Sequence, residues 1–218
     1  MGSITRGLSN NITTGGVILP AGITNASVSA VTSFANASGG TLILLSTQTA
    51  SASANISFTT GLDSTYDAYE FHFINMHPAT DGANFTFNMS TDSGSNYNVT
   101  KTTTVFRAYH SEADASELAY EASEDLAQST AFQILAPSIG NDNDQHYSGV
   151  LTLFNPSSTT YVKHFIARGV CYLSSDLQTD HNQAGYANTT SAINAIRFQM
   201  SSGNIDDGII KMYGLKKS

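Results

Sequence analysis

The chain has one cysteine, no tryptophan and few charged residues, and each shortage excludes a class of protein. A single thiol, Cys171, forms neither an internal disulfide nor a multi-thiolate metal site. Nine lysines and arginines stand against seventeen acids, for a net charge of -8, so we expect no basic face for nucleic acid. No apolar stretch approaches the ~20 residues of a membrane span, and the start, MGSITRGLSNN, lacks a signal-peptide core. We therefore expect neither nucleic-acid nor membrane partners, and no export by a signal peptide.

Hydroxyl and amide side chains take the place of charge. Charged residues make up 12% of the chain, against about 25% in an average soluble protein, whereas Ser, Thr and Asn supply about a third of it. With 40% hydrophobic residues, 10 tyrosines and 11 phenylalanines, the chain is too apolar to be disordered. Its 218 residues suffice for one all-β domain with a sizeable core, or for a small domain carrying a long arm.

The N-terminal part is a long tract without charge. Residues 7–62 contain no Asp, Glu, Lys or Arg, and the first part of the tract has too few large apolar side chains for a core of its own. It is either a flexible linker or an extended arm that becomes ordered on neighbouring subunits. The absence of charge favours the arm, because surfaces buried between subunits are depleted in charge. We predict an arm over residues 1–40, with these apolar anchors: Val17, Ile18, Leu19, Ile23, Val28, Val31 and Phe34.

Residues 41–218 have the alternation and turn spacing of a β-domain. The side chains expected to face inward in two early strands are Tyr69, Phe71, Phe73, Phe85, Phe87 and Met89, with Asn84, Thr86 and Asn88 facing outward. The turn sequence HPATDG between these strands predicts a hairpin. SSGNIDDG predicts a second hairpin at the C-terminal end. Eight to ten strands separated by turns indicate an antiparallel β-sandwich of the jelly-roll kind.

An acidic stretch, residues 112–125, interrupts this pattern. Its acids are Glu112, Asp114, Glu117, Glu121, Glu124 and Asp125. Leu118, Ala122 and Leu126 recur every four residues, which permits about three turns of helix. Six acids without a basic partner would make a weak helix, so a loop crossing the domain is nearly as well supported.

No arrangement of residues meets the requirements of a catalytic site. The sequence has no G-x-S-x-G, HExxH or H-x-H motif. We interpret His72 and His164 as outward-facing surface residues of strands, and Cys171 as a small core residue. In residues 141–144, Asp142 and Asp144 are weak candidates for a cation site, and a solvated turn is the preferred interpretation. We expect a protein that is not an enzyme and has no cofactor.

Sugar binding is an alternative of a different class. The lack of tryptophan removes the best platform for stacking a sugar ring. Loop tyrosines with a neighbouring amide would take its place, and the expected glycan contacts are Tyr66, Asn96, Tyr97 and Tyr186.

Three blocks of the sequence carry a family resemblance. They are GGTLILLSTQTASASANISFTTGLDSTYDAYEFHFINMHPATDGANFTFNMSTDSGSNY, FNPSSTTYVKHF and MSSGNIDDGIIKMYG. They resemble virion structural proteins of tailed bacteriophages, especially phages of cyanobacteria and marine bacteria. The N-terminal ITNASVSAVTSF is similar to the Ser- and Thr-rich joints of phage appendage proteins. These blocks are strand-and-turn patterns, so the resemblance implies a location in the virion and supplies no catalytic residues.

The resemblance implies a non-enzymatic protein of the virion that is assembled in the host cytoplasm. Its expected partners are the major capsid protein or appendage subunits and further copies of itself, with a trimer as one option. Because the chain is short and has no fibrous repeat, we favour a capsid cement or decoration protein. A module of a tail fibre, or one that binds a host surface glycan, is the alternative.

Overall fold

The computed structural model describes residues 12–13, 16–17 and 41–215. The chain divides into two units, Met1–Gly39 and Gly40–Ser218. In the first unit, β1 (Ile12–Thr13) pairs antiparallel with β2 (Gly16–Val17). Of the anchors predicted for the arm, Val17 lies in β2, and those within residues 18–34 lie outside the described residues. The described residues contain no helix, so none that is long and apolar enough to cross a membrane.

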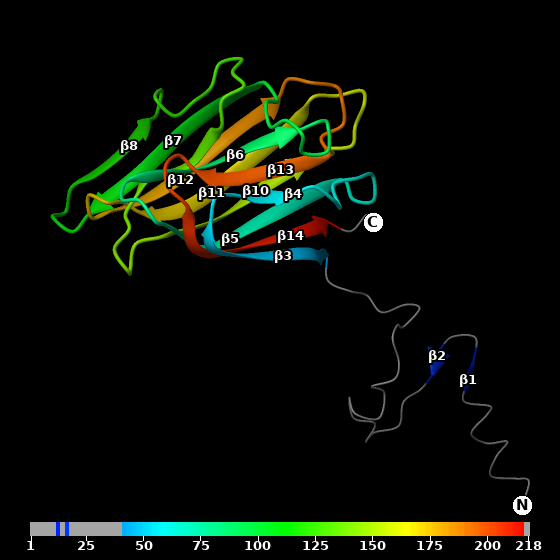
Figure 1. Cartoon of the computed structure of the whole chain (residues 1–218), viewed down its shortest axis with the longest axis horizontal. Helices are drawn as coiled ribbons and strands as arrows, with labels where there is room; N and C mark the ends of the chain where they lie inside the picture. Colours follow the sequence, from blue (N-terminus) through cyan, green and yellow to red (C-terminus); the bar gives the residue numbers. More distant parts are fainter. Residues whose placement is uncertain (1–11, 14–15, 18–40, 216–218) are drawn as a thin grey trace, which may run out of the picture. The chain divides into compact units, whose positions relative to one another are not determined.

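The second unit consists of two antiparallel sheets (Figure 1). The eight-stranded sheet has the order β3 (Leu42–Ser53), β14 (Ile205–Leu215), β5 (Ala68–Pro78), β10 (Tyr147–Phe154), β11 (Lys163–Tyr172), β12 (Leu177–Ala187), β7 (Lys101–Ser111) and β8 (Ser116–Tyr120). The four-stranded sheet has the order β4 (Ile56–Phe58), β13 (Ala195–Met200), β6 (Ala83–Ser90) and β9 (Gln133–Ile139). This arrangement confirms the predicted all-β chain and is consistent with a β-sandwich.

Aromatic side chains from both sheets fill the core between them. Phe198 of β13 lies at its centre, with ring centroids 5.1–6.4 Å from those of Phe58, Phe71, Phe73, Phe85 and Phe87. The predicted inward faces are confirmed, since every residue named for them is at most 2% exposed. The interpretation of Cys171 as a core residue is confirmed too, because it is 1% exposed.

The predicted hairpin between β5 and β6 is wrong. β5 belongs to the eight-stranded sheet and β6 to the four-stranded sheet, so the HPATDG turn carries the chain from one sheet to the other. The crossing brings Phe73 and Phe85 together across the core in an edge-to-face contact, with ring centroids 5.3 Å apart. An alternating strand followed by a turn describes a hairpin and such a crossing equally well.

The predicted C-terminal hairpin is wrong for the same reason. β13 lies in the four-stranded sheet and β14 in the eight-stranded sheet. The two crossings lie side by side, because the Ala79 amide donates to the Asn204 carbonyl at 3.0 Å and the Ser201 amide donates to the Asn84 carbonyl at 2.8 Å. β5 pairs with β14 in one sheet, and β6 pairs with β13 in the other. The two pairs are continuous through the adjacent crossings, so together they form one two-stranded ribbon that folds over the core.

The acidic stretch is neither the predicted helix nor a loop throughout. Its centre forms β8, which pairs with the end of β7 at the edge of the larger sheet. Like charges four residues apart destabilise a helix, whereas the strand lets Glu121 accept a hydrogen bond from Arg107 Nε at 2.5 Å. Leu118, expected in an apolar helical stripe, is 73% exposed.

Thr86 and Asn88 were predicted to face solvent, and the structure buries both. Two loop segments cover this side of the four-stranded sheet. Asn88 Nδ2 donates to the carbonyls of Tyr97 and Thr130, at 2.8 and 2.9 Å, and its Oδ1 accepts from Lys101 Nζ at 2.6 Å. Polar side chains are needed here because the covering loops present backbone carbonyls that would otherwise lack donors.

Candidate functional site

One face of the eight-stranded sheet packs on the smaller sheet, and we call the opposite face the outer face. Its side chains come from alternate positions, so that in β11 Phe165 points into the core while Ile166 points out. The outer face keeps large apolar side chains in contact with solvent. Five of them have exposed fractions between 47% and 73%: Phe106, Leu118, Tyr120, Ile166 and Val170. Exposed apolar surface of this extent is typical of a surface that contacts another protein.

A groove crosses the middle of the outer face. It has a volume of about 380 Å³ and is lined by Phe106, Val150 and Ile166, among others. Strand pairing holds its walls in place, because Ile166 lies opposite Ala184 and Phe106 lies opposite Asn182. A second hollow of about 330 Å³ shares Ile166 and Ala184 with the groove and extends it.

Arg168 and Asp180 lie beside the groove, and their charges neutralise each other. Arg168 donates from Nε to Asp180 Oδ1 at 3.1 Å and from Nη2 to Oδ2 at 2.7 Å. The hydrogen bonds from Arg168 hold the pKa of Asp180 below its ordinary value. Where this ion pair lies, the groove presents little net charge, which suits an apolar partner better than a charged ligand.

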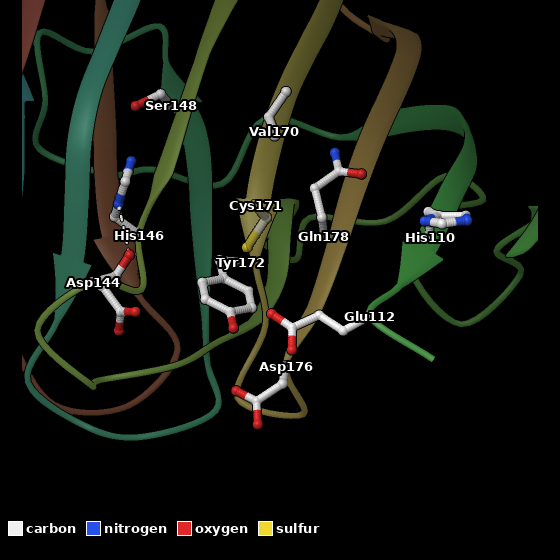
Figure 2. Close-up of a pocket in the computed structure, with 10 residues that line it drawn as sticks. All are labelled: His110, Glu112, Asp144, His146, Ser148, Val170, Cys171, Tyr172, Asp176 and Gln178. Carbon is white, nitrogen blue, oxygen red and sulfur yellow. Dashed lines mark hydrogen bonds between the residues drawn. The ribbon is translucent and has the colours of Figure 1, made fainter. Parts of the chain in front are cut away.

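A polar pocket lies where β7 and β11 end and β12 begins (Figure 2). It has a volume of about 480 Å³, and in this view Asp144 and His146 lie on one side of Tyr172 while Glu112 and Asp176 lie on the other. Partial burial and then the nearby carboxylates raise the pKa of Tyr172. Carboxylate, imidazole and phenol groups around an open pocket are suited to binding a hydrogen-bonding molecule and do not by themselves form a catalytic arrangement.

Cys171 belongs to the lining of this pocket, but its thiol is not a nucleophile at neutral pH. Burial raises the pKa of Cys171 to about 12, and the carboxylate of Glu124 contributes to the rise. The thiolate is the reactive form of cysteine. Since only a very small fraction of this thiol ionises at neutral pH, the residue acts as part of the core.

The two acids named as a weak cation site lie in the loop before β10. Asp142 and Asp144 are both exposed. The Asp142 carbonyl accepts a hydrogen bond from the Gln145 amide at 2.9 Å, as in a tight turn. Among the residues that the structure describes, no group of three or more His, Cys, Asp or Glu side chains is placed to hold a metal ion.

The residues named as glycan contacts do not share a hollow. Tyr66 packs edge-on against Tyr69, with ring centroids 5.7 Å apart, and lines a separate hollow. Asn96 donates to Asp92, and the ring of Tyr97 lies under the Arg197 guanidinium at 4.0 Å. Tyr186 lies on the outer face and lines the extension of the groove. We find no common binding surface for the four residues.

Sequence reasoning missed a buried pair of ionisable residues. Glu124 lies in the turn after β8, and its Oε2 is 3.5 Å from Nδ1 of His181, a fully buried residue of β12. In the described part of the chain, neither ring nitrogen of His181 has a hydrogen-bond partner. Burial raises the pKa of Glu124 to about 7 and lowers that of His181 to about 4, so both groups are uncharged in mildly acidic solution.

We expect Glu124→Gln to stabilise the protein at pH 8 and to change its stability little at pH 5. The folded-state pKa of Glu124 lies above the ordinary value of 4.5, so the stabilising contribution of the protonated group is present below about pH 4.5 and is lost as the pH rises through 7. Glutamine stays neutral, and its advantage in the free energy of unfolding at pH 8 is about 1–3 kcal/mol. Urea denaturation at the two pH values measures it. Glu117→Gln, at an exposed position of β8, is the control; an equal effect of Glu124→Gln at pH 5 and pH 8 contradicts the prediction.

The outer face itself was also missed, although the sequence carries a signal for it. In β11, KHFIARGVCY, apolar residues stand at both alternating sets of positions, with Phe165 and Ala167 on one side and Ile166 and Val170 on the other. A strand with one solvated face normally alternates between apolar and polar residues. The excess of apolar residues therefore indicated that the outer face of this strand is apolar as well.

Comparisons of the chain with models of protein families, with curated proteins and with solved structures found no match.

Proposed function

We propose that the protein is a non-enzymatic structural component of a tailed-phage virion, of the capsid cement or decoration kind. The observation that carries the proposal is the outer face, which leaves Phe106 and Ile166 about half exposed around a groove of low net charge. Apolar side chains gathered on an exposed face are typical of a surface that contacts another protein. The blocks that resemble phage virion proteins supply the location.

In this proposal the chain attaches through its N-terminal arm, residues 1–40, and covers its outer face against neighbouring subunits of the particle. The arm sequence carries no charge after Arg6, which suits a surface buried between subunits. The ribbon of β5 with β14 and β6 with β13, folded over the core, supports a sandwich of the jelly-roll kind. Assembly takes place in the host cytoplasm, and the mature location is the virion. A tail-fibre or host-glycan-binding module remains the alternative prediction.

Incorporation into particles tests the proposal. We expect a chain lacking residues 1–39 to fold, as judged by circular dichroism, and to be lost from purified virions. The full chain with Phe106→Ser and Ile166→Ser should be depleted as well, because both substituted side chains are exposed and leave the core intact. Tyr161→Ser, at a 70% exposed aromatic in the β10–β11 loop, is the matched control. Incorporation of the truncated chain at the level of the full chain contradicts the role of the arm.

A further inference from the structure

The sandwich has four edge strands, and they differ in how they are protected. β3 and β8 form the edges of the eight-stranded sheet, and β4 and β9 form those of the four-stranded sheet. An edge strand presents a row of unpaired backbone N–H and C=O groups to any strand that approaches. Natural proteins protect such edges with charge, proline, bulges or short length.

Three of the four edges have such protection. β8 is five residues long and carries Glu117, with Glu112, Asp114 and Glu121 close to it in the chain. β4 is three residues long. β9 contains Pro137, and its pairing with β6 shifts register twice. A second chain would therefore find no long, regular and uncharged edge at any of these strands.

β3 is the exception. It is twelve residues long, and its sequence, LILLSTQTASAS, has no charge and no proline. β14 is its only strand partner among the described residues. A bulge at Leu45 divides the strand, and residues 46–53 beyond it pair with β14 in a single register. The exposed residues here include Thr47, Thr49 and Ser51.

We propose that β3 pairs antiparallel with β3 of a second copy about a two-fold axis, joining two eight-stranded sheets into one. A two-fold contact needs only one self-complementary surface, and the backbone of an antiparallel edge is self-complementary. Each copy carries a net charge of -8, so two copies repel over most of their surface. The uncharged β3 edge brings them together with little repulsion, whereas pairing through β8 places Glu117 against an identical acid.

This contact lies within the Gly40–Ser218 unit and does not depend on the N-terminal arm. The virion experiment therefore tests the role of the arm, and the pairing experiment tests the β3 contact, so that either proposal can fail without the other. A full chain that joins virions and is monomeric in solution supports the arm and overturns the β3 contact. A full chain that dimerises through β3 and is absent from virions supports the β3 contact and contradicts the proposed virion function.

Cysteine cross-linking in the full chain tests the contact directly. Cys171 is the only native cysteine and is buried, so an introduced surface thiol is the reactive one. Three single variants are each oxidised alone: Thr47→Cys, Thr49→Cys and Ser51→Cys. An equal mixture of the Thr47→Cys and Thr49→Cys proteins is oxidised as well. An antiparallel pair places facing residues within disulfide distance, so we expect disulfide dimers at the position nearest the axis or in the mixture. Thr159→Cys, at an exposed position of the β10–β11 loop, is the control. Dimer yields no higher than this control overturn the proposal.

A change of charge gives the second measurement. At about 100 µM, well above a micromolar Kd, sedimentation should show a dimer of the full chain. Thr47→Lys combined with Thr49→Lys should weaken the dimer at least tenfold, since it places like charges across the two-fold axis. Thr159→Lys, in the exposed β10–β11 loop, should not weaken it. A monomer at this concentration overturns the proposal, and this is the result expected if residues 18–40 of the same chain cover β3. A trimer whose dissociation is unchanged by the β3 substitutions overturns it as well.

Discussion

Replacing Phe198 with alanine should lower the free energy of unfolding by about 3–5 kcal/mol. Phe198 is fully buried on β13, and its ring contacts the rings of Phe58 and Phe87 in its own sheet and of Phe71 and Phe73 in the facing sheet. Alanine loses the transfer free energy of the ring and leaves a cavity that stiff aromatic neighbours fill poorly. The lost contacts join both sheets, so no local shift of one strand restores them.

Urea denaturation followed by fluorescence or circular dichroism measures this effect, with the midpoint and the slope fitted together. Phe154→Ala is the matched control. Phe154 is 40% exposed at the end of β10, so its truncation should cost less than about 1 kcal/mol. If Phe198→Ala costs no more than Phe154→Ala, the two sheets do not pack on each other around this residue as described.

The composition and periodicity of the sequence predicted an all-β domain and the inward-facing side of β5 and β6. Eight to ten strands were expected, whereas the described part of the second unit has twelve, and β8, β9 and β12 were not predicted. Tyr69 and Phe73 are buried as predicted, because alternation in a strand depends only on local geometry. Which strand pairs with which is a different matter. The turns after β5 and β13 were recognised, but a turn sequence does not record whether the next strand stays in its sheet or crosses the core. Both predicted hairpins failed on this point.

The candidate site was predictable to a smaller extent. Phe106 and Ile166 are exposed because no other described segment of the chain covers that face of the sheet, which is a long-range property that no local pattern contains. Burial of Asn88 depends on the course of the two loop segments that bring the Tyr97 and Thr130 carbonyls to its side chain. The same holds for Lys101, a charged residue at the start of a strand, whose sequence context gives no sign that loops enclose it.

Lys101 should make the protein more stable as the pH rises from 7 to 9. The residue begins β7 and is 0% exposed, and its Nζ donates to Asn88 Oδ1 at 2.6 Å and to the Val99 carbonyl at 2.8 Å. Burial lowers its pKa from 10.5 to about 7. Between these two values the unfolded chain binds a proton that the folded chain does not, so the free energy of unfolding increases with pH. The contribution is complete above about pH 10.5 and is lost as the pH falls through 7.

The comparison of wild type with Lys101→Met isolates this contribution from other titrating groups. Between pH 7 and 9 the free energy of unfolding should rise about 2 kcal/mol more in wild type than in the variant, since one proton contributes at most about 1.4 kcal/mol per pH unit. At pH 9 the variant should be less stable than wild type, because methionine removes the side-chain donor to the buried Val99 carbonyl and one of the two donors to Asn88 Oδ1, which keeps only the Met89 amide. Lys211→Met, on the half-exposed side of β14, should show the pH dependence of wild type. If the free energy of unfolding changes equally with pH in wild type and Lys101→Met, the prediction is wrong. The Lys101 ammonium would then keep its charge inside the protein, stabilised by its two hydrogen-bond acceptors.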